Sequence, residues 1–519
     1  MELERQILHK NREVGRAFSQ MTLDDDYNLP DFKPDLTKVI KERGKIHLDE
    51  IHVNNGHVWF KGVMEFDILY RTDLDNRKIN SLNGEISFQE SLSIDGTEEL
   101  DPVKVEGRIE DISVSVINSR KLSIRSLVEF TAVAEKPEEA VVLTGIGEQA
   151  ECEVETEQMN VLELMTDKKD TFRIRKEIAL SSNKPNMDEI LWRSVELRGL
   201  SSHLRNGEIE VSGEALIYVF YAGIEEEERL QWFETTVPVQ GSVECNICEE
   251  ALVHRIDANL AQVNLEIQPD EDGEERNIML EMVINLSICL WNEEQIEMIS
   301  DIYALDRQVN PAFQTVYFEK LLVKNEAKCR IADKIELDAE QEDILQICSN
   351  EEKLTVEQTT VTDEGVLVEG TLTVEILYMT PDEAMPVGAK RAYIPFSQVI
   401  EMPKAENPVK IHLDGGIEQV TTVLTDSRTI DVKAVISLNL LAFEQQERQT
   451  ITDIEETELD LAALQQRPGI VGYIAREGDR LFGIAKENHT TVENLMETNH
   501  LTGPFVKPGE KLLIIKTVG

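Results

Sequence analysis

The stretch NGHVWFKGVMEFDILY, residues 55–70, decides the fold because the chain contains two further copies of its pattern. The copies are NGEIEVSGEALIYVFY at residues 206–221 and EGVLVEGTLTVEILY at residues 364–378. Each copy has a glycine near its start, a second glycine five or six positions later, and a tyrosine eight residues after that. Apolar and polar residues alternate between these markers, which is typical of a half-buried β-strand. The glycines predict a hairpin turn and a bulge or close backbone approach, and the tyrosine predicts a core position.

Other markers repeat in the same order and indicate three tandem units. KPDLTKVI at residues 33–40 matches KPNMDEIL at residues 184–191, with a weaker echo, DAEQEDIL, at residues 338–345. Late in the units come SRKLSIR, RNIMLE and SRTIDVK, and the units close with LTGI, ISDI and ITDI. The predicted fold class is therefore mainly β, with three tandem β-rich, sandwich-like repeat domains. KPNMDEIL is interpreted as a helical turn, because Pro185 stands near its start and carboxylates follow.

The chain length fits several domains, and the markers suggest where each begins. The first residues are interpreted as an N-terminal helix that either docks a partner or caps the first unit, and we favour the cap. The predicted boundaries are 1–22 for this helix, 23–155, 156–312 and 313–462 for the repeats, 463–470 for a linker, and 471–519 for a small C-terminal domain.

The composition argues against two classes of partner. One hundred Asp and Glu residues against 52 Lys and Arg give a formal net charge of −48, which repels phosphate backbones and anionic lipid head groups. This charge either keeps a large protein soluble or steers a basic partner onto its surface. The first thirty residues lack the apolar run of a signal peptide, and no apolar stretch has the length of a transmembrane helix. We therefore expect a cytoplasmic protein that binds neither nucleic acid nor bare membrane.

No pattern of catalytic or metal-ligating residues stands out. The six cysteines include one CxxC pair, Cys245 and Cys248, whereas zinc would need a second pair. Neighbouring carboxylates also oppose thiolate formation there. His47, His52 and His57 recur at five-residue intervals, which places them on no common face of a strand or helix. We expect a non-enzyme without metal or cofactor. An enzyme is the alternative if the three copies share one concave cluster of titratable residues.

The repeated unit resembles the sporulation-associated SPOCS domain of spore-forming Firmicutes. The resemblance rests on the opening LPDFKPDLTKVI (residues 29–40), the strand with two glycines and a tyrosine, and the closing segment ISDIY (residues 299–303). It covers three repeats and most of residues 25 to 460. These motifs are structural signatures without catalytic chemistry, so the resemblance implies a fold and no active site.

The last fifty residues are similar along their full length to a LysM domain, which implies a βααβ fold. Leu481 and Ile484 recur at helical spacing, in agreement with that fold. Asp479 is predicted to cap the first helix, and Thr490 with Glu493 is predicted to form a capping box for the second. The residues that carry the signature YxxxxGDxLxxIA are Tyr473, Gly478, Asp479, Leu481, Ile484 and Ala485.

The LysM resemblance implies a shallow groove between two loops, in which LysM domains hold N-acetylglucosamine chains. We call residues 477–482 the first groove loop and residues 500–506 the second groove loop. Such a groove works through backbone hydrogen bonds and apolar contact with sugar faces. Where the family has Thr or Ser this chain has Arg480, which either disfavours ordinary glycan recognition or is a solvated helix residue. The candidate ligand-binding or partner-binding residues are Gly478, Asp479, Arg480, Leu481, Phe482, Thr502, Gly503, Pro504 and Phe505.

Three SPOCS-like repeats followed by one LysM-like domain resemble the SipL family of clostridial spore coat morphogenetic proteins. The resemblance implies a non-enzymatic adaptor in the mother-cell cytoplasm, attached to the forespore surface and the spore coat. Its LysM domain is implied to bind the morphogenetic ATPase of the coat basement layer, and the repeats to contact other coat proteins during encasement. The alternative is a peptidoglycan-binding protein that holds N-acetylglucosamine polymer of the cell wall or spore cortex.

Overall fold

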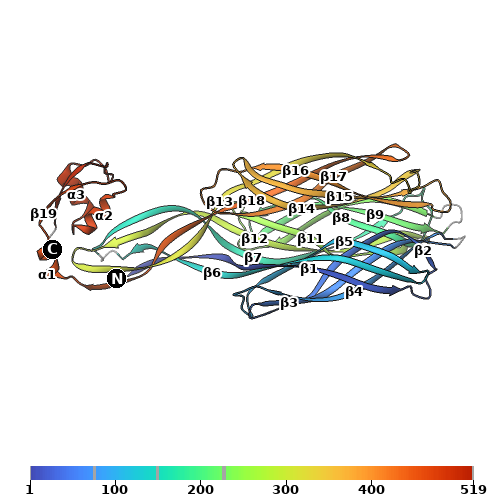
Figure 1. The fold of residues 1–519 in the computed structure, drawn as a ribbon, viewed down its shortest axis with the longest axis horizontal. Coiled ribbons are helices and arrows are strands. Elements are labelled where there is room, and N and C mark those ends of the chain that lie inside the picture. The colour runs from blue at the N-terminus through green and yellow to red at the C-terminus, as the bar shows by residue number, and fades with distance from the viewer. Residues whose placement is uncertain (1, 74–76, 148–150, 225–229, 517–519) are drawn as a thin grey trace.

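The computed structural model describes residues 2–73, 77–147, 151–224 and 230–516. Most of these residues lie in β-strands, and the short helices are confined to the C-terminal end (Figure 1). The prediction of a mainly β fold, with β-rich units followed by a small βααβ module, is confirmed. Within the described ranges, no helix is long and apolar enough to span a bilayer.

Each repeat consists of two three-stranded antiparallel sheets. In repeat 1 one sheet has the order β1-β6-β5 and the other the order β2-β3-β4. The strands of repeat 1 are β1 (Leu3–Asn28), β2 (Leu36–Asn54), β3 (His57–Thr72), β4 (Ile79–Ser93), β5 (Val103–Asn118) and β6 (Lys121–Ile146).

Repeats 2 and 3 have the same strand order, with sheets β7-β12-β11 and β8-β9-β10, then β13-β18-β17 and β14-β15-β16. The strands of repeat 2 are β7 (Glu153–Ala179), β8 (Met187–Arg205), β9 (Glu208–Gly223), β10 (Leu230–Glu244), β11 (Val253–Pro269) and β12 (Glu275–Tyr303). Those of repeat 3 are β13 (Arg307–Glu336), β14 (Gln346–Thr362), β15 (Gly365–Met379), β16 (Val387–Glu401), β17 (Val409–Asp426) and β18 (Thr429–Glu458).

The glycines of the three similar stretches have the two roles that the sequence predicts. The stretches form β3, β9 and β15, the central strands of their sheets. Gly56 and Gly207 lie in the preceding hairpin turns with φ of 83° and 89°, a conformation that favours glycine. A Cβ at Gly62 would lie 2.0 Å from the carbonyl oxygen of His47, beside a register shift in β2. The second glycine therefore allows the central strand to approach a bulged neighbour.

The tyrosines at the ends of these strands lie in the apolar cores of their repeats, as predicted. We call the two sheets of each repeat, with the core between them, a lobe. Tyr70, Tyr221 and Tyr378 are 0%, 0% and 1% exposed. The hydroxyl of Tyr70 donates to the Pro34 carbonyl at 3.2 Å, and that of Tyr221 donates to the Pro185 carbonyl at 3.1 Å. Burial raises the pKa of Tyr70 to about 12, so its hydroxyl remains a neutral donor. The hydrogen bonds join the central strand to the segment that precedes the second strand of the repeat.

An arginine in the last hairpin of each repeat holds the loop between the first two strands. Arg120 donates to the carbonyl oxygens of Lys33 at 2.6 Å and Pro30 at 2.9 Å. The equivalent contacts are Arg276 with Lys184 (3.0 Å) and Ser181 (2.9 Å), and Arg428 with Gln341 (3.1 Å) and Asp338 (2.8 Å). One guanidinium thus satisfies at least two loop carbonyls in every repeat. We call these residues the loop arginines.

The interpretation of KPNMDEIL as a helical turn is wrong. Residues 182–184 form a turn or bend, and Met187 already begins β8, whose first partner in β9 is Gly223. The loop carbonyls are satisfied by Arg276 instead of by amides four residues ahead. Pairing with β9 therefore outweighs the local preference for a helix.

The predicted N-terminal helix at residues 1–22 is also wrong, because residues 3–22 belong to β1 and Met1 lies outside the described residues. This strand pairs with β6 from Leu3 opposite Ile146 to Asn28 opposite Lys121. It buries Leu8, which is 3% exposed, and Leu23, which is 6% exposed. The partner strand lies more than ninety residues away in the sequence, so local propensity does not reveal it.

The predicted repeat boundaries fall inside strands. The boundary at 22/23 lies in β1, that at 155/156 in β7 and that at 312/313 in β13. Repeats 1 and 2 instead meet between β6 and β7, and repeats 2 and 3 meet between β12 and β13. The predicted linker at 463–470 contains most of a short helix, α1 (Leu461–Gln466).

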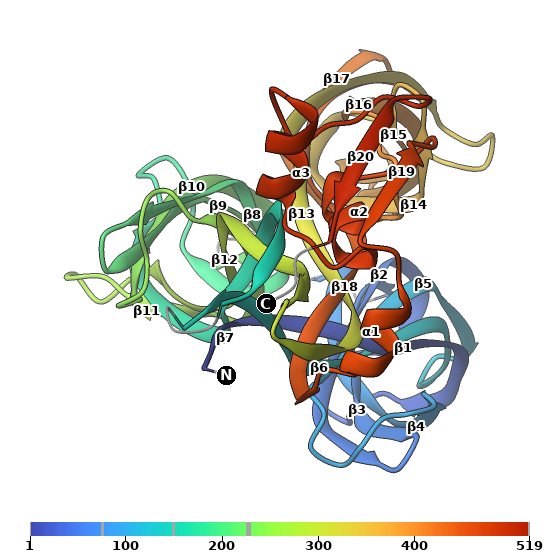
Figure 2. The ribbon, with the colours of Figure 1, turned by 90° about the vertical axis from the view of Figure 1, so that its left-hand side faces the viewer.

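The three repeats stand around a common axis, like three subunits of a trimer made from one chain (Figure 2). Each lobe has its own apolar core between its two sheets. A further apolar cluster takes residues from all three repeats: Leu69 and Ile79, Trp192 and Phe220, and Leu377 and Val387. The lobes therefore form one packed body and do not hang as separate beads.

The first and last strands of each repeat extend beyond the lobes as ribbons that twist together into a stalk (Figure 1). The paired strands are β1 with β6, β7 with β12, and β13 with β18. Apolar side chains from all three ribbons fill the centre of the stalk, among them Leu8, Val142, Met159, Ile296, Val316 and Phe318. We call the end of the repeat 2 ribbon, residues 299–305 with residues 153–156 opposite, the repeat 2 tip.

The C-terminal module has the predicted βααβ order. Its strands β19 (Ile470–Ile474) and β20 (Lys511–Ile515) pair antiparallel. Its helices α2 (Leu481–Glu487) and α3 (Val492–Asn499) share an apolar core with one face of this sheet. The module lies beside the stalk, at the end of the molecule away from the lobes (Figure 1).

Candidate functional site

The first groove loop is built around Asp479. Its carboxylate accepts the Arg476 amide at 2.7 Å and the Tyr473 hydroxyl at 2.8 Å. These two hydrogen bonds hold the pKa of Asp479 below its ordinary value. The prediction that Asp479 caps the first helix is wrong, since the N-cap of α2 is Arg480, which makes no side-chain capping bond. Asp479 instead closes the turn at Gly478, where φ is 88°.

The second helix is capped one residue later than predicted. The Thr491 side chain accepts the Asn494 amide at 3.0 Å, so the capping box of Thr490 and Glu493 is wrong. Thr490 is fully buried, and its carbonyl accepts the hydroxyl of Tyr303 at 2.9 Å. Thr490 therefore contacts the stalk, and Thr491 caps the helix.

The repeat 2 tip contacts the first groove loop and helix α2. The Tyr303 ring packs edge-on against Phe482, with ring centroids 5.0 Å apart. Both carboxylate oxygens of Asp301 accept hydrogen bonds from Lys486 Nζ, at 2.6 and 2.7 Å. Arg480 Nη1 lies 3.1 Å from Glu155 Oε1. Together these contacts dock the module on the stalk.

The nine predicted groove residues differ in how far they remain accessible. Leu481 lies in the module core, and Phe482 is only 8% exposed because it packs against Tyr303. In the second groove loop, by contrast, Thr502 and Pro504 are exposed, Gly503 is half-buried, and Phe505 is 88% exposed. In the first groove loop Gly478 and Arg480 are exposed and Asp479 is half-buried. This loop thus contacts the repeat 2 tip through Phe482 and Arg480, while the second loop makes no such contact among the described residues and remains open to solvent.

An apolar surface on the outer side of β19 and β20 was not predicted from the sequence. Ile470 pairs with Ile515 and Gly472 pairs with Leu513 across the sheet. Val471 and Tyr473 face the helices, so the alternate side chains face away from them. Ile470, Ile474, Leu513 and Ile515 are all exposed, by 46% to 66%. We call these four residues the outer face. The continuous apolar run of both strands was the available signal, because a two-stranded sheet buries only one side in its own core.

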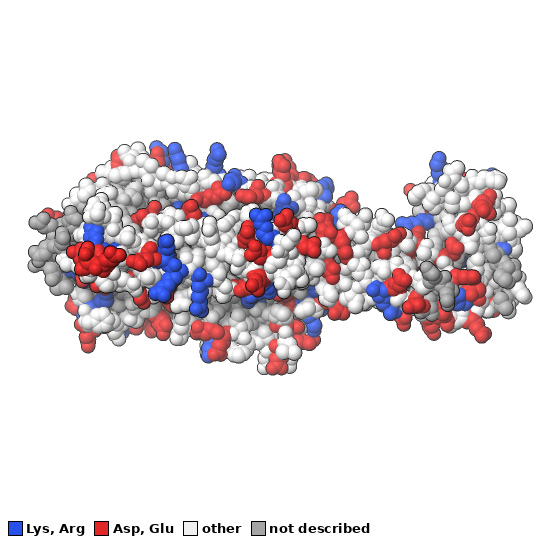
Figure 3. All heavy atoms as spheres, turned by 180° about the vertical axis from the view of Figure 1, so that it is seen from behind, with Lys and Arg blue, Asp and Glu red and all other residues white. Residues whose placement is uncertain are grey.

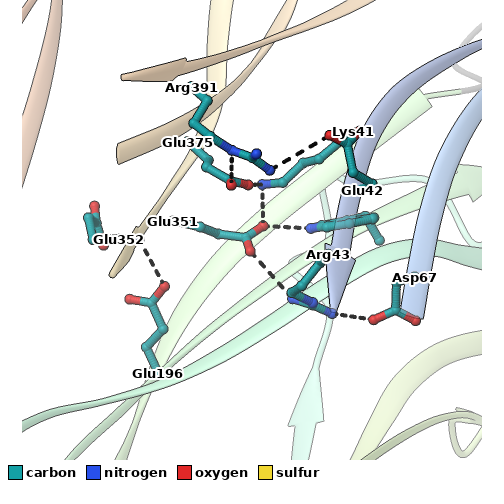
Figure 4. Close-up of polar contacts among 10 residues, drawn as sticks. Lys41, Glu42, Arg43, Asp67, Glu196, Glu351, Glu352, Glu375 and Arg391 are labelled. Carbon is teal, nitrogen blue, oxygen red and sulfur yellow. Dashed lines mark hydrogen bonds and ion pairs between the residues drawn. The ribbon is translucent and has the colours of Figure 1, made fainter. Parts of the chain in front are cut away.

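Buried charges join the lobes at the axis (Figure 4). Glu351 accepts Lys41 Nζ at 2.7 Å and Trp192 Nε1 at 2.5 Å, and Arg43 Nη1 lies 3.4 Å away. Burial opposes ionisation of Glu351, but Lys41 and Arg43 hold its pKa below the ordinary value. Repeats 1, 2 and 3 each contribute to this contact. The arrangement is that of an interior polar network that fixes how the lobes meet.

A second polar contact joins repeats 2 and 3. Arg198 Nη2 lies 3.0 Å from Glu196 Oε2 and 2.7 Å from Glu352 Oε2. Burial raises the pKa of both carboxyl groups, and the adjacent Glu196 helps to raise that of Glu352 to about 8. One cation thus faces two buried carboxyl groups, and the pair retains a proton at neutral pH.

The thiols and imidazoles singled out in the sequence have ordinary structural surroundings. Cys245 and Cys248 are free and buried, and burial raises the pKa of Cys248 to about 12. His47 contacts Glu65 at 3.0 Å, and His52 contacts Glu50 at 3.3 Å. In the described part of the chain, no group of three or more His, Cys, Asp or Glu residues is placed to hold a metal ion.

Charge is distributed unevenly between the body and the module. Residues 467–519 carry seven Lys and Arg against six Asp and Glu, so residues 1–466 carry a formal net charge of −49. Basic side chains are scattered among more numerous acidic ones on the face shown in Figure 3. The module is therefore a nearly neutral surface at the end of a strongly acidic molecule.

Comparison with protein families identifies both kinds of domain. The description "SipL, SPOCS domain" matches residues 35–117 and 343–425, and the LysM domain matches residues 473–514. The first two stretches cover β2 to β5 of repeat 1 and the equivalent strands of repeat 3, and repeat 2 lies outside them. No similar curated protein and no similar solved structure was found. The chain thus carries SipL-type SPOCS domains and a LysM domain, which support a spore coat protein with a module of the peptidoglycan-binding type.

Proposed function

We propose that this chain is a non-enzymatic adaptor of spore coat morphogenesis. In this proposal it lies in the mother-cell cytoplasm at the forespore surface, where its LysM module binds the ATPase of the coat basement layer. The body then contacts other coat proteins and supports encasement. The SipL-type SPOCS domains together with the LysM domain support this assignment.

The observation that carries the proposal is the outer face of the module. Four large aliphatic side chains lie exposed on the paired strands β19 and β20. An apolar surface of this kind favours a protein partner, because aliphatic side chains match a protein surface better than a hydroxyl-rich sugar. The first groove loop, in contrast, already contacts the repeat 2 tip.

The distribution of charge supports separate roles for module and body. The acidic body attracts basic surfaces of coat proteins and repels acidic ones. The module is nearly neutral and lies at the far end of the stalk, so it neither attracts nor repels a partner strongly by charge. One molecule can therefore attach at one end and recruit at the other.

The test is capture of purified basement-layer ATPase filaments by the full chain. The double change Ile474→Glu with Leu513→Glu places two charges on the outer face, and we expect it to weaken capture roughly tenfold or more. Val423→Glu is the matched control, since Val423 is equally exposed on β17 of the body. Equal capture by the wild type and the double variant would refute the outer face as the binding surface.

A second candidate function is binding of peptidoglycan glycan, favoured by the LysM match and by the exposed Phe505 in the second groove loop. It predicts that the full chain sediments with purified peptidoglycan and that Phe505→Ser lowers the bound fraction. The outer-face double variant would leave this binding unchanged. The two functions are thus distinguished by two results: the outer-face double variant loses ATPase capture only, and Phe505→Ser loses peptidoglycan binding only.

A further inference from the structure

The three ribbons of the stalk end in nearly equivalent tips, yet the module docks on one of them. The closing segments are LTGIG, ISDIY and ITDIE, so the position of Tyr303 holds Gly147 in repeat 1 and Glu455 in repeat 3. Tyr303 packs on Phe482 and donates to the Thr490 carbonyl. Of the three equivalent positions, only this one, at the repeat 2 tip, holds a tyrosine. Neither glycine nor glutamate can supply an aromatic ring or this buried hydroxyl.

The charges beside Tyr303 differ between the tips in the same way. Asp301 stands opposite Glu155 in the ribbon, which gives Lys486 and Arg480 one partner each. The equivalent pair in repeat 1 is Gly145 opposite Glu4, and in repeat 3 it is Asp453 opposite Ala312. Repeat 2 thus has two carboxylates where the others have one, and they match two cations of the module.

The dock uses residues that a groove ligand would need. Phe482 is the large apolar side chain of the first groove loop, and it is 8% exposed in the docked module. Arg480, at the edge of the same loop, is held by Glu155. A glycan chain lying between the two groove loops needs an apolar platform on both sides, and the docked module offers only that of the second loop.

We propose that the repeat 2 tip is an internal competitor of the LysM groove. While the tip holds the first groove loop, the module does not take up N-acetylglucosamine polymer; when the tip is released, the groove binds it. Tyr303, Asp301 and Glu155 are then specificity-determining residues, although they lie outside the module. This inference rests on the module of the proposed function, but on its groove and not on its outer face.

The contacts of the dock suit a reversible competitor. The ion pairs are partly exposed, with side-chain exposures of 28% for Asp301 and 35% for Lys486, and such pairs are individually weak. The linker keeps the tip at a high effective concentration near the groove, so weak contacts suffice to exclude a weak external ligand. A change in one charge should therefore shift the balance measurably.

The test is retention of the full chain on chitin beads, which present N-acetylglucosamine polymer. Asp301→Lys and Lys486→Asp each place like charges together at the dock, and we expect each to raise the retained fraction roughly tenfold over wild type. The double variant restores an opposite-charge pair with its signs exchanged, and we expect retention to return toward the wild-type value. Tyr303→Ser is an independent undocking variant that changes no charge and should behave like the single variants.

Asp453→Lys is the matched control, because Asp453 occupies the position of Asp301 on the repeat 3 tip and is exposed there. It should leave retention at the wild-type level. Equal retention of wild type and undocked variants, or no retention of any of them, would overturn the inference. If the wild-type chain captures no ATPase filaments while this chitin pattern holds, the proposed function is refuted and the inference still stands.

Discussion

Repeats 1 and 3 differ from repeat 2 in a way that separates lobe formation from assembly. All three have the same strand order, a loop arginine and a buried tyrosine at the end of the central strand. At the axis, however, the equivalent position holds Lys41 in repeat 1, Trp192 in repeat 2 and Ser349 in repeat 3. The residues that the repeats share build each lobe, and the residues that differ determine how the lobes meet and where the module docks.

The stretches that match the SPOCS domain lie in two of the three repeats. The matched stretches lie in repeats 1 and 3, whereas repeat 2 carries the tryptophan of the axis and the tyrosine of the dock. In a trimer of identical chains these positions would be identical. A single chain can vary them independently, so repeat 2 can acquire contacts that its neighbours lack.

The largest expected effect comes from breaking the contact between unlike repeats. Glu351→Ala removes the carboxylate that lies between buried Lys41 and half-buried Arg43. Among the described carboxylates, Lys41 then keeps only Glu375, at 3.5 Å, and Arg43 keeps only Asp67, so we expect a loss of about 3 kcal/mol in the free energy of unfolding. Urea denaturation followed by tryptophan fluorescence measures it. Glu340→Ala, at an exposed site in the same repeat, should change stability by less than about 0.5 kcal/mol. Similar losses for the two variants would show that the axis network does not hold the lobes together.

A smaller and uniform effect is expected from the feature that the repeats share. Arg120→Ala, Arg276→Ala and Arg428→Ala each release at least two loop carbonyls, which should lower stability by about 1–3 kcal/mol in every case. Thermal unfolding of the three variants beside the exposed control Arg330→Ala measures it. If Arg276→Ala were harmless while the other two were not, repeat 2 would not share the construction of its neighbours.

The smallest effect concerns pH at the contact of repeats 2 and 3. The pKa of Glu352 is about 8 in the folded chain, above its ordinary value of 4.5, because of burial and the adjacent Glu196. The folded state therefore binds more protons than the unfolded state between these values, so this group's stabilisation falls as pH rises from about 5 to 8 and then levels off.

Glu352→Gln removes this dependence, since glutamine keeps a neutral side chain at every pH. At pH 9 the variant should be more stable than wild type by about 1 kcal/mol, and near pH 5 the difference should shrink. Urea midpoints measured from pH 5 to 9 give the comparison. A difference that does not change with pH would contradict a proton held by the Glu196 and Glu352 pair.

The sequence predicted those features that depend on local pattern. The roles of Gly62 and Tyr70 follow from alternation and spacing within one strand, and the βααβ order of the module follows from a specific signature. The N-terminal helix was a wrong prediction because β1 depends on β6, a partner far along the chain. The turn at residues 182–184 was missed because Arg276, which holds it, lies about ninety residues away.

The candidate site was predictable in part. The groove loops were placed from the LysM signature, whereas the dock was not foreseen, since ISDIY was interpreted only as a closing segment of the repeat. Tyr303 acquires its role through contact with Thr490 and Phe482, which belong to another domain. The arrangement of the lobes around an axis was not predicted either. Its contacts join different repeats, and the equivalent positions hold different residues, so the sequence shows no repeated pattern there.

The most direct test of the docked module is amide hydrogen exchange of residues 481–491 in the full chain. These residues include Phe482, Lys486 and Thr490, which contact the repeat 2 tip. We predict slow exchange in the wild type, faster exchange in Asp301→Lys and in Lys486→Asp, and recovered protection in the double variant. The same exchange rate in all four proteins would contradict the dock and, with it, the role assigned to repeat 2.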